Sequence, residues 1–254
     1  MLSRRAILKA TLGLCGCGGC AATVATSARS EPTHIQGPGY DVRFVGTQRN
    51  TIANGRIEAL IGMRSLANTP HLYAIGPIEQ LRGEVTVINS RPSLSRVGPN
   101  RSIEVSESFE TGAPFLVWAE VPAWRTLQIP AEVRSFTDLE AFVPRAAETA
   151  ALDPQRPLPF LVHGRQDLIE FHILNRVGDE PYSPAKLKEI QVPFDVAGAE
   201  AIIVGFYSPS HRGIFTPADS PMHIHFQTMK NDASGHIHGL EIGAGAVLSL
   251  PRAQ

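Results

Sequence analysis

Two histidines separated by one residue lie near the C-terminal end of the chain, and a third follows after ten intervening residues. The pattern is His223-Ile224-His225 and then His236. Side chains at positions i and i+2 of a strand share a face, so His223 and His225 can direct their imidazoles to one point. Three imidazoles bind zinc and leave one coordination position open, as catalytic sites require. Copper, iron, nickel and manganese are not excluded by this ligand type.

The segment between the second and third histidines is short and polar. Residues 230–235 are typical of a turn, so we expect His236 on an antiparallel strand beside the first two histidines. An isolated H-x-H also occurs by chance on exposed strands, but a third histidine at hairpin distance favours a metal site. On a regular strand His238 would share the face of His236, as a fourth ligand or a supporting group. His211 lies in a loop rich in Pro, Ser and Gly, where we expect an exposed side chain.

Strand-like runs dominate the elements that must position these side chains. We expect a strand over residues 41–47, a helix over 54–64 and several strands between 71 and 122. Ser135 followed by Asp138 predicts a helix start, and Pro144 is expected to shorten or kink that helix. Further strands are expected over residues 160–163, 168–174, 190–194, 201–207, 223–228 and 237–242. The fold class is therefore α+β, with an internal boundary at the proline-rich stretch 152–159.

Composition and charge exclude several classes of protein. The 254 residues include 23 basic and 24 acidic side chains, and this balance argues against a nucleic-acid-binding protein. Apolar residues make up 43% and charged residues 19%, which is typical of a globular chain. No stretch has the length and hydrophobicity of an interior membrane span. The sequence predicts a single β-rich domain of two lobes, residues 29–150 and 151–254.

The first 28 residues are typical of an export signal. Arg4-Arg5 precedes an uncharged stretch, and small residues near Ala28 offer a cleavage site, as in twin-arginine signals. All three cysteines, Cys15, Cys17 and Cys20, lie in this segment. Cleavage removes three positive charges, Arg4, Arg5 and Lys9, so the net charge changes from -1 to -4. We expect an exported, periplasmic or extracellular protein without thiols; a lipid anchor at Cys17 is the alternative.

Several segments, in the same order, resemble the signature of the alpha-acetolactate decarboxylase family. The matching segments are Gly76–Glu84, Pro114-Phe115, Glu180–Tyr182, Val204–Pro209, Met222–Phe226 and Ser234–His236. Together they extend over roughly residues 52–239, which makes the resemblance far more specific than the histidine pattern alone.

The resemblance implies a reaction, a cofactor and a fold. It implies zinc ligands at His223, His225 and His236, and an active-site glutamate at Glu84. The implied fold is a mixed β lobe with helices packed on an antiparallel, barrel-like C-terminal lobe, in a protein that is often a homodimer. The implied reaction converts 2-acetolactate, a small 2-hydroxy-3-keto acid, to acetoin and carbon dioxide. A Lewis-acid metal suits this chemistry, and Glu84 is the candidate proton donor.

The sequence departs from the family pattern where the family has an active-site arginine. His172 aligns with that arginine, and Arg165 and Arg176 lie nearby. On a regular strand His172 shares a face with Glu170, so we expect it to face the metal and to pair with that carboxylate. Unlike arginine, a histidine carries a charge at neutral pH only when its surroundings raise its pKa. We take His172 as the second candidate catalytic residue.

Two other departures keep alternative functions open. Pro77 replaces a threonine of the motif, and Glu241, the only acidic residue after His236, does not match the spacing of a further family glutamate. One alternative is a divergent member with other metal-dependent lyase, isomerase or hydrolase chemistry. The other is an exported metal-binding protein without catalysis, in which Glu84 has no role.

Overall fold

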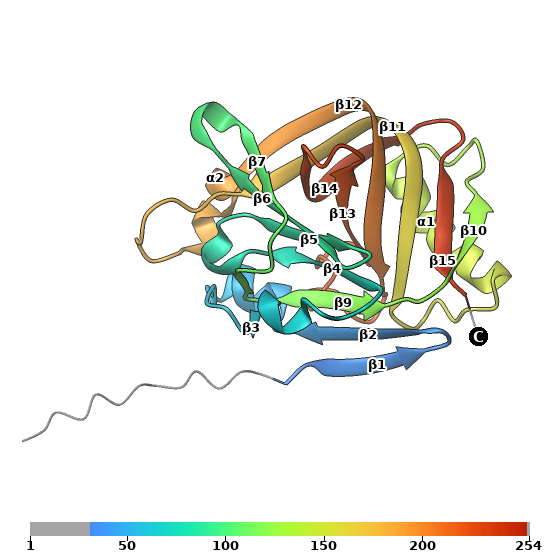
Figure 1. Ribbon diagram of the computed structural model, residues 1–254, viewed down its shortest axis with the longest axis horizontal. Helices are drawn as coiled ribbons and strands as arrows, with labels where there is room; N and C mark the ends of the chain where they lie inside the picture. The colour runs from blue at the N-terminus through green and yellow to red at the C-terminus, as the bar shows by residue number, and fades with distance from the viewer. Residues whose placement is uncertain (1–30, 253–254) are drawn as a thin grey trace, which may run out of the picture.

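The computed structural model describes residues 31–252, so the predicted signal segment and its three cysteines lie outside the described residues. Within this range the chain forms two antiparallel sheets, a two-stranded ribbon and few helices, which together make one domain (Figure 1). This architecture confirms the α+β, strand-dominated class. None of the helices in the described range is long and apolar enough to cross a membrane.

The first sheet has seven strands in the order β1-β2-β9-β4-β5-β6-β7. Its strands are β1 (Thr33–Gly37), β2 (Tyr40–Val45), β4 (Leu72–Pro77), β5 (Glu84–Ile88), β6 (Arg91–Val97), β7 (Ile103–Ser106) and β9 (Leu116–Glu120). The ribbon pairs β3 (Ile61–Gly62) with β8 (Gly112–Ala113). In β5 the odd-numbered valines, Val85 and Val87, enter one core cluster, so Glu84 and Thr86 face the other way, toward the second sheet.

The second sheet has six strands and closes partly on itself. Its strands are β10 (Trp124–Gln128), β11 (Leu158–Leu174), β12 (Gln191–Tyr207), β13 (Met222–Thr228), β14 (Ser234–Ile242) and β15 (Val247–Pro251). Strand β11 pairs with β12, and β12, β13 and β14 follow in order; β14 then pairs back onto β11. This closure makes the barrel-like lobe that the resemblance implied. Figure 1 shows β11 and β12 as the longest strands, running side by side across the molecule.

Helix α1 (Phe136–Thr149) begins where the sequence predicted. Ser135 Oγ accepts a hydrogen bond from the Asp138 backbone N–H, and the Asp138 carboxylate accepts one from the Ser135 N–H. This capping box satisfies two of the unpaired donors at the helix start. The helix continues past Pro144 to its last turn, contrary to the expected shortening, and its buried face joins the main core cluster.

The helix expected over residues 54–64 is not formed. A π-helical turn, η1 (Arg49–Ala53), ends just before Gly55, whose φ of +68° is a left-handed conformation that stops a helix. Ile57, one of the apolar residues with helical spacing, is instead buried in a small core cluster. The remaining short helices are η2 (Met63–Leu66), η3 (Glu79–Leu81), η4 (Pro99–Arg101), η5 (Pro184–Lys186) and α2 (Leu187–Ile190).

The two sheets face each other across the main core, and polar contacts fix their relative position near the histidines. Ile75 and Val117 of the first sheet share this core with Phe171 of the second. Ser93 Oγ on β6 lies 2.9 Å from Ser234 Oγ on β14, and both side chains are buried. Strand β5, the neighbour of β6, contacts β13 and β14, the strands that carry the histidine pattern.

Candidate metal centre

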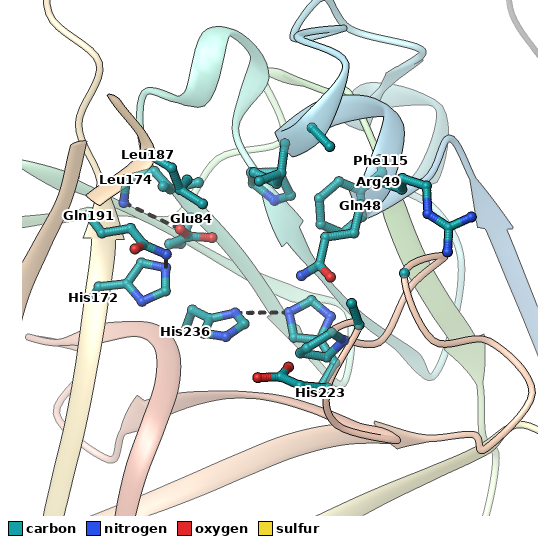
Figure 2. Close-up of a pocket in the computed structure, with 17 residues that line it drawn as sticks. Gln48, Arg49, Glu84, Phe115, His172, Leu174, Leu187, Gln191, His223 and His236 are labelled. Atoms are coloured by element: carbon teal, nitrogen blue, oxygen red, sulfur yellow. Dashed lines mark hydrogen bonds between the residues drawn. The ribbon is translucent and has the colours of Figure 1, made fainter. Parts of the chain in front are cut away.

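The three predicted metal ligands converge between the two sheets. The Nε2 atom of His223 lies 3.2 Å from Nε2 of His225 and 3.0 Å from Nδ1 of His236. One ligand nitrogen from each residue lies within 4.8 Å of the other two. His225 and His236 are register partners on β13 and β14, as the hairpin reading of the sequence predicted. Figure 2 shows the imidazoles of His223 and His236 facing each other across the site.

The donor set fits a small divalent transition metal. Zinc–nitrogen bonds of about 2.0–2.1 Å in a tetrahedron place two ligand nitrogens about 3.3 Å apart. The observed separations of 3.0 and 3.2 Å are close to this value. No thiolate or carboxylate belongs to the cluster found among residues 31–252, so the ligands are imidazoles alone. Such a set suits zinc and other transition metals and is poorly suited to calcium or magnesium.

Neighbouring groups fix the orientation of two of the imidazoles. The Nδ1 atom of His223 donates to the carbonyl oxygen of Phe215 at 2.7 Å. The Nδ1 atom of His225 lies 3.2 Å from Oγ1 of Thr86, a fully buried side chain on β5. Hydrogen bonds of this kind select the tautomer that leaves the other ring nitrogen free for a metal.

Burial keeps the three imidazoles neutral. It lowers the pKa of His223 to about 4, against the opposing effect of the hydrogen bond to Phe215. Burial, reinforced by the neighbouring histidines, lowers the pKa values of His225 and His236 well below the ordinary value. At neutral pH these nitrogens therefore carry lone pairs rather than protons, which is the form that binds a metal.

Glu84 lies at the edge of the same site. Its side chain is 2% exposed, its Oε1 accepts a hydrogen bond from the Leu174 N–H at 3.3 Å, and its Oε2 lies 3.9 Å from Nε2 of His225. Burial raises the pKa of this carboxyl well above its ordinary value, and the hydrogen bond from Leu174 only partly opposes the shift. Burial therefore favours the protonated form of this carboxyl group, which is the form that can donate a proton.

His172 also faces this site. Its ring centroid lies 4.7 Å from that of His236, and its Nε2 lies 3.5 Å from Nε2 of Gln191. The expected pairing with Glu170 is not formed: Glu170 is exposed and lies against Gly239. Burial lowers the pKa of His172 to about 3, and the charges of nearby histidines lower it further in the same direction. His172 is therefore neutral, unlike the arginine to which it corresponds.

The two arginines near His172 in sequence do not reach the site. Arg165 packs its guanidinium against Gly198, near the middle of the β11–β12 pair. Arg176 donates to Oε1 of Gln80 and to the carbonyl of Glu180. Neither residue lines the cavity described next.

A cavity of about 530 Å³ opens onto His172, His223, His236 and Glu84. Its walls also include residues that the sequence did not single out: Gln48, Arg49, Leu187, Gln191 and Asp219. Figure 2 shows Gln48 and Arg49 on the side opposite His172 and Gln191. Phe115, which belongs to one of the matched segments, lines it as well. No motif marks Gln48 or Arg49, because a loop contact between distant segments brings them to the site.

The two remaining histidines of the C-terminal cluster lie outside the ligand set. His238 is exposed, and a bulge in the β11–β14 pairing places it beside His172, with ring centroids 5.8 Å apart. His211 is half-buried rather than exposed: its Nδ1 lies 2.8 Å from Oγ of Ser208, and its ring stacks on Phe215. It supports the loop whose carbonyl orients His223.

Comparison with known proteins agrees with the geometry of the fold. Among solved structures, a Staphylococcus aureus protein of unknown function similar to alpha-acetolactate decarboxylase superimposes with a TM-score of 0.65 at 16% identity, covering 82% of this chain and 83% of that one. Alpha-acetolactate decarboxylase from Bacillus subtilis strain 168 gives 0.63 at 16% identity, covering 82% and 84%. Acetolactate decarboxylase from Bacillus subtilis subspecies spizizenii gives 0.64 at 14% identity, covering 83% and 85%. These similarities show a shared fold.

A search of curated proteins found none that matches the chain. The family model described as alpha-acetolactate decarboxylase matches residues 48–251, which include every strand that contributes to the metal centre. The chain therefore belongs to the alpha-acetolactate decarboxylase family.

Proposed function

We propose that this protein is a zinc-dependent carboxy-lyase that converts 2-acetolactate, or a close 2-hydroxy-3-keto acid, to acetoin and carbon dioxide. One observation carries the proposal: a buried carboxyl group with a raised pKa, Glu84, lies beside three neutral imidazoles, and it lines a single cavity together with His223 and His236. Metal ligands and a proton donor are the two components that decarboxylation of such an acid needs. Membership of the family supports the same class of reaction.

His223, His225 and His236 would hold the metal ion. When bound there, the ion supplies Lewis-acid stabilisation of the negative charge that develops on the substrate's oxygens. The remaining chemistry belongs to the protein. Loss of carbon dioxide breaks the bond between the carboxylate and the carbon that carries the hydroxyl group, and the electron pair stays with the organic product as an enolate. That carbon then needs one proton from a defined direction.

Glu84 is placed to deliver this proton. Its Oε1 is held by the Leu174 N–H, which leaves Oε2, the oxygen nearer His225, as the donor. Transfer from Oε2 to the enolate carbon completes acetoin, and a solvent proton restores the carboxyl group, so each turnover consumes one proton. Because Glu84 lies on one wall of the cavity, only one face of the enolate is protonated. The product is therefore expected to be a single enantiomer.

His172 acts as a neutral hydrogen-bond donor in this account. With the Gln191 amide oriented as in the structure, its Nε2 donates to Nε2 of His172 (Figure 2). The proton of His172 is then on Nδ1, because its ring is neutral. This N–H contributes a hydrogen bond, rather than a positive charge, to substrate bound in the cavity.

The test is turnover of racemic 2-acetolactate by zinc-loaded protein, with acetoin and carbon dioxide measured together. We expect equal amounts of the two products, loss of turnover on metal removal and recovery on adding zinc. His223→Ala is the matched control, since it removes one ligand and leaves Glu84 in place. Turnover no faster than spontaneous decarboxylation would contradict the proposal. Zinc bound without turnover would favour the divergent or non-catalytic alternatives.

We also propose, from the sequence pattern alone, that residues 1–28 direct export. The paired arginines Arg4 and Arg5 are the feature on which twin-arginine transport depends. Replacing both by lysine should retain the protein inside the cell with its N-terminal segment uncleaved. Unchanged export of that variant would contradict the assignment, and labelling of Cys17 with a lipid would favour the anchored form.

A further inference from the structure

We propose that Arg49 binds the carboxylate group of the substrate, on the side of the cavity opposite His172. The inference rests on the proposed function for the chemical class of the ligand, a 2-hydroxy acid anion. Arg49 lines the same cavity as His223 and His236, and no other residue of its lining carries a permanent positive charge. A carboxylate that enters this cavity therefore meets one guanidinium. That guanidinium belongs to Arg49, which follows β2 of the first sheet.

The guanidinium of Arg49 rests against a glycine. A Cβ atom placed on Gly213 would lie 3.1 Å from Nη2 and 3.5 Å from Cζ of Arg49, so the missing side chain leaves the space that the guanidinium occupies. Gly213 also has a φ of +71°, a conformation that other residues rarely adopt. In Figure 2 the Arg49 side chain lies at this flank of the cavity, with its guanidinium directed away from His236.

Backbone hydrogen bonds hold Arg49 in register with the metal centre. The Arg49 N–H donates to the carbonyl of Gly213 at 2.9 Å, and the Gln48 N–H donates to that of Ile214 at 2.7 Å. The next carbonyl along the same loop, that of Phe215, accepts the hydrogen bond from Nδ1 of His223. Three consecutive loop residues thus hold the backbone of Gln48 and Arg49 and the imidazole of His223.

The donors of Arg49 remain available to a ligand. Within residues 31–252 its guanidinium forms no ion pair within 4.0 Å and no hydrogen bond to a side chain. Asp219 lines the same cavity but does not pair with it; the Asp219 carbonyl accepts a hydrogen bond from Arg212 instead. A guanidinium presents parallel N–H donors that match the two oxygens of a carboxylate. Such a pair supplies orientation as well as affinity.

The experiment measures binding rather than turnover. Isothermal titration calorimetry on zinc-loaded protein compares 2-hydroxy-2-methylpropanoate, which has no keto group and cannot lose carbon dioxide by this route, with its neutral amide. The ratio of the two affinities reports the charge interaction, because contacts shared by both ligands cancel. Arg49→Gln should lower this ratio about tenfold, equivalent to about 1.4 kcal/mol. The affinity ratio of Arg49→Lys should lie between those of the wild-type protein and Arg49→Gln, since an ammonium group cannot form the bidentate pair.

Arg56→Gln is the matched control. Arg56 follows η1, is exposed like Arg49 and lines a different cavity, so the substitution makes the same change in net charge outside the site. Its affinity ratio should equal that of the wild-type protein. An Arg49→Gln variant with the wild-type ratio, or an equal fall in Arg56→Gln, would overturn the proposal. A selective fall in Arg49→Gln would support it even if the protein failed to turn over 2-acetolactate, so the two proposals fail separately.

Discussion

The imidazole of His223 is fixed by a backbone carbonyl: its Nδ1 lies 2.7 Å from the oxygen of Phe215. A carbonyl oxygen only accepts hydrogen bonds, so the proton of the neutral ring must be on Nδ1. The lone pair on Nε2 then faces Nε2 of His225 and Nδ1 of His236. The loop that contains Phe215 therefore sets the protonation of a metal ligand as well as its position.

Thr86 should strengthen metal binding through His225. Its Oγ1 lies 3.2 Å from Nδ1 of His225, and the carbonyl of Val85 provides a second partner for the same imidazole. Thr86→Val keeps the volume of the side chain and removes one of these partners. We expect the zinc affinity to fall about tenfold, the lower end of the usual range for such supporting contacts. Competition with a chromogenic chelator measures the affinity.

The matched control for this prediction is Thr126→Val on β10. Thr126 is exposed and does not line the cavity, so the zinc affinity of the Thr126→Val variant should remain that of the wild-type protein. An unchanged affinity in Thr86→Val would show that the Val85 carbonyl alone orients His225.

Glu84 should destabilise the metal-free protein increasingly as the pH rises. Burial raises its pKa in the folded state, so the folded state binds more protons than the unfolded state above the ordinary value of 4.5. The free energy of unfolding contributed by this residue is therefore fully present below pH 4.5 and declines as the pH rises toward the folded-state pKa. The decline is limited to about 1.4 kcal/mol per pH unit.

Glu84→Gln provides the measurement, because glutamine keeps the acceptor for the Leu174 N–H and does not titrate. Urea unfolding of both proteins in the presence of a chelator, at several pH values between 5 and 8, gives the difference in free energy. We expect the glutamine variant to gain stability relative to the wild-type protein as the pH rises. A constant difference across this range would mean that Glu84 is ionised in the fold.

His172 should matter for turnover but not for metal retention. It lies beside His236, yet it is outside the ligand cluster and contacts Gln191 instead. Loss of a hydrogen-bond donor to a developing negative charge reduces turnover on the order of 10²-fold. We expect this loss in kcat for His172→Ala, with the zinc content unchanged.

His163→Ala is the comparison for that variant. His163 is on the same strand, half-buried, and does not line the cavity. It should retain both zinc and turnover. Loss of zinc from His172→Ala would identify His172 as a fourth ligand, and unchanged turnover would remove its role in the reaction.

Much of the site was predictable because its geometry is local. His223, His225 and His236 follow from the two-residue period of a strand and one short turn, and the structure has that hairpin. The start of α1 at Ser135 was predictable for the same reason, since a capping box involves residues three apart. The expected strands over 160–163 and 168–174 fuse into one, β11, because pairing with β12 continues across Gly164.

The other parts of the site depend on contacts between distant segments. Arg49 reaches the cavity through backbone hydrogen bonds to Gly213, and no side-chain pattern records such contacts. The orienting group of His223 is a main-chain carbonyl, which any residue at position 215 would supply. His238 was expected on the face of His236 as a fourth ligand or a supporting group; it lies beside His172, as His236 does, next to a bulge in the β11–β14 register and outside the ligand cluster. Bulges depend on both paired strands and are not visible in one of them.

The most direct test of the central claim is the metal content of the purified protein beside two histidine variants. We expect about one zinc ion per wild-type chain, because the structure has one cluster of three converging imidazoles within the described residues. His223→Ala should lose this zinc, because His223 belongs to the cluster. His238→Ala should keep it, because His238 is a histidine outside the cluster. Inductively coupled plasma mass spectrometry measures the zinc content of all three proteins. Stoichiometric zinc in His223→Ala, or loss confined to His238→Ala, would contradict the assigned centre.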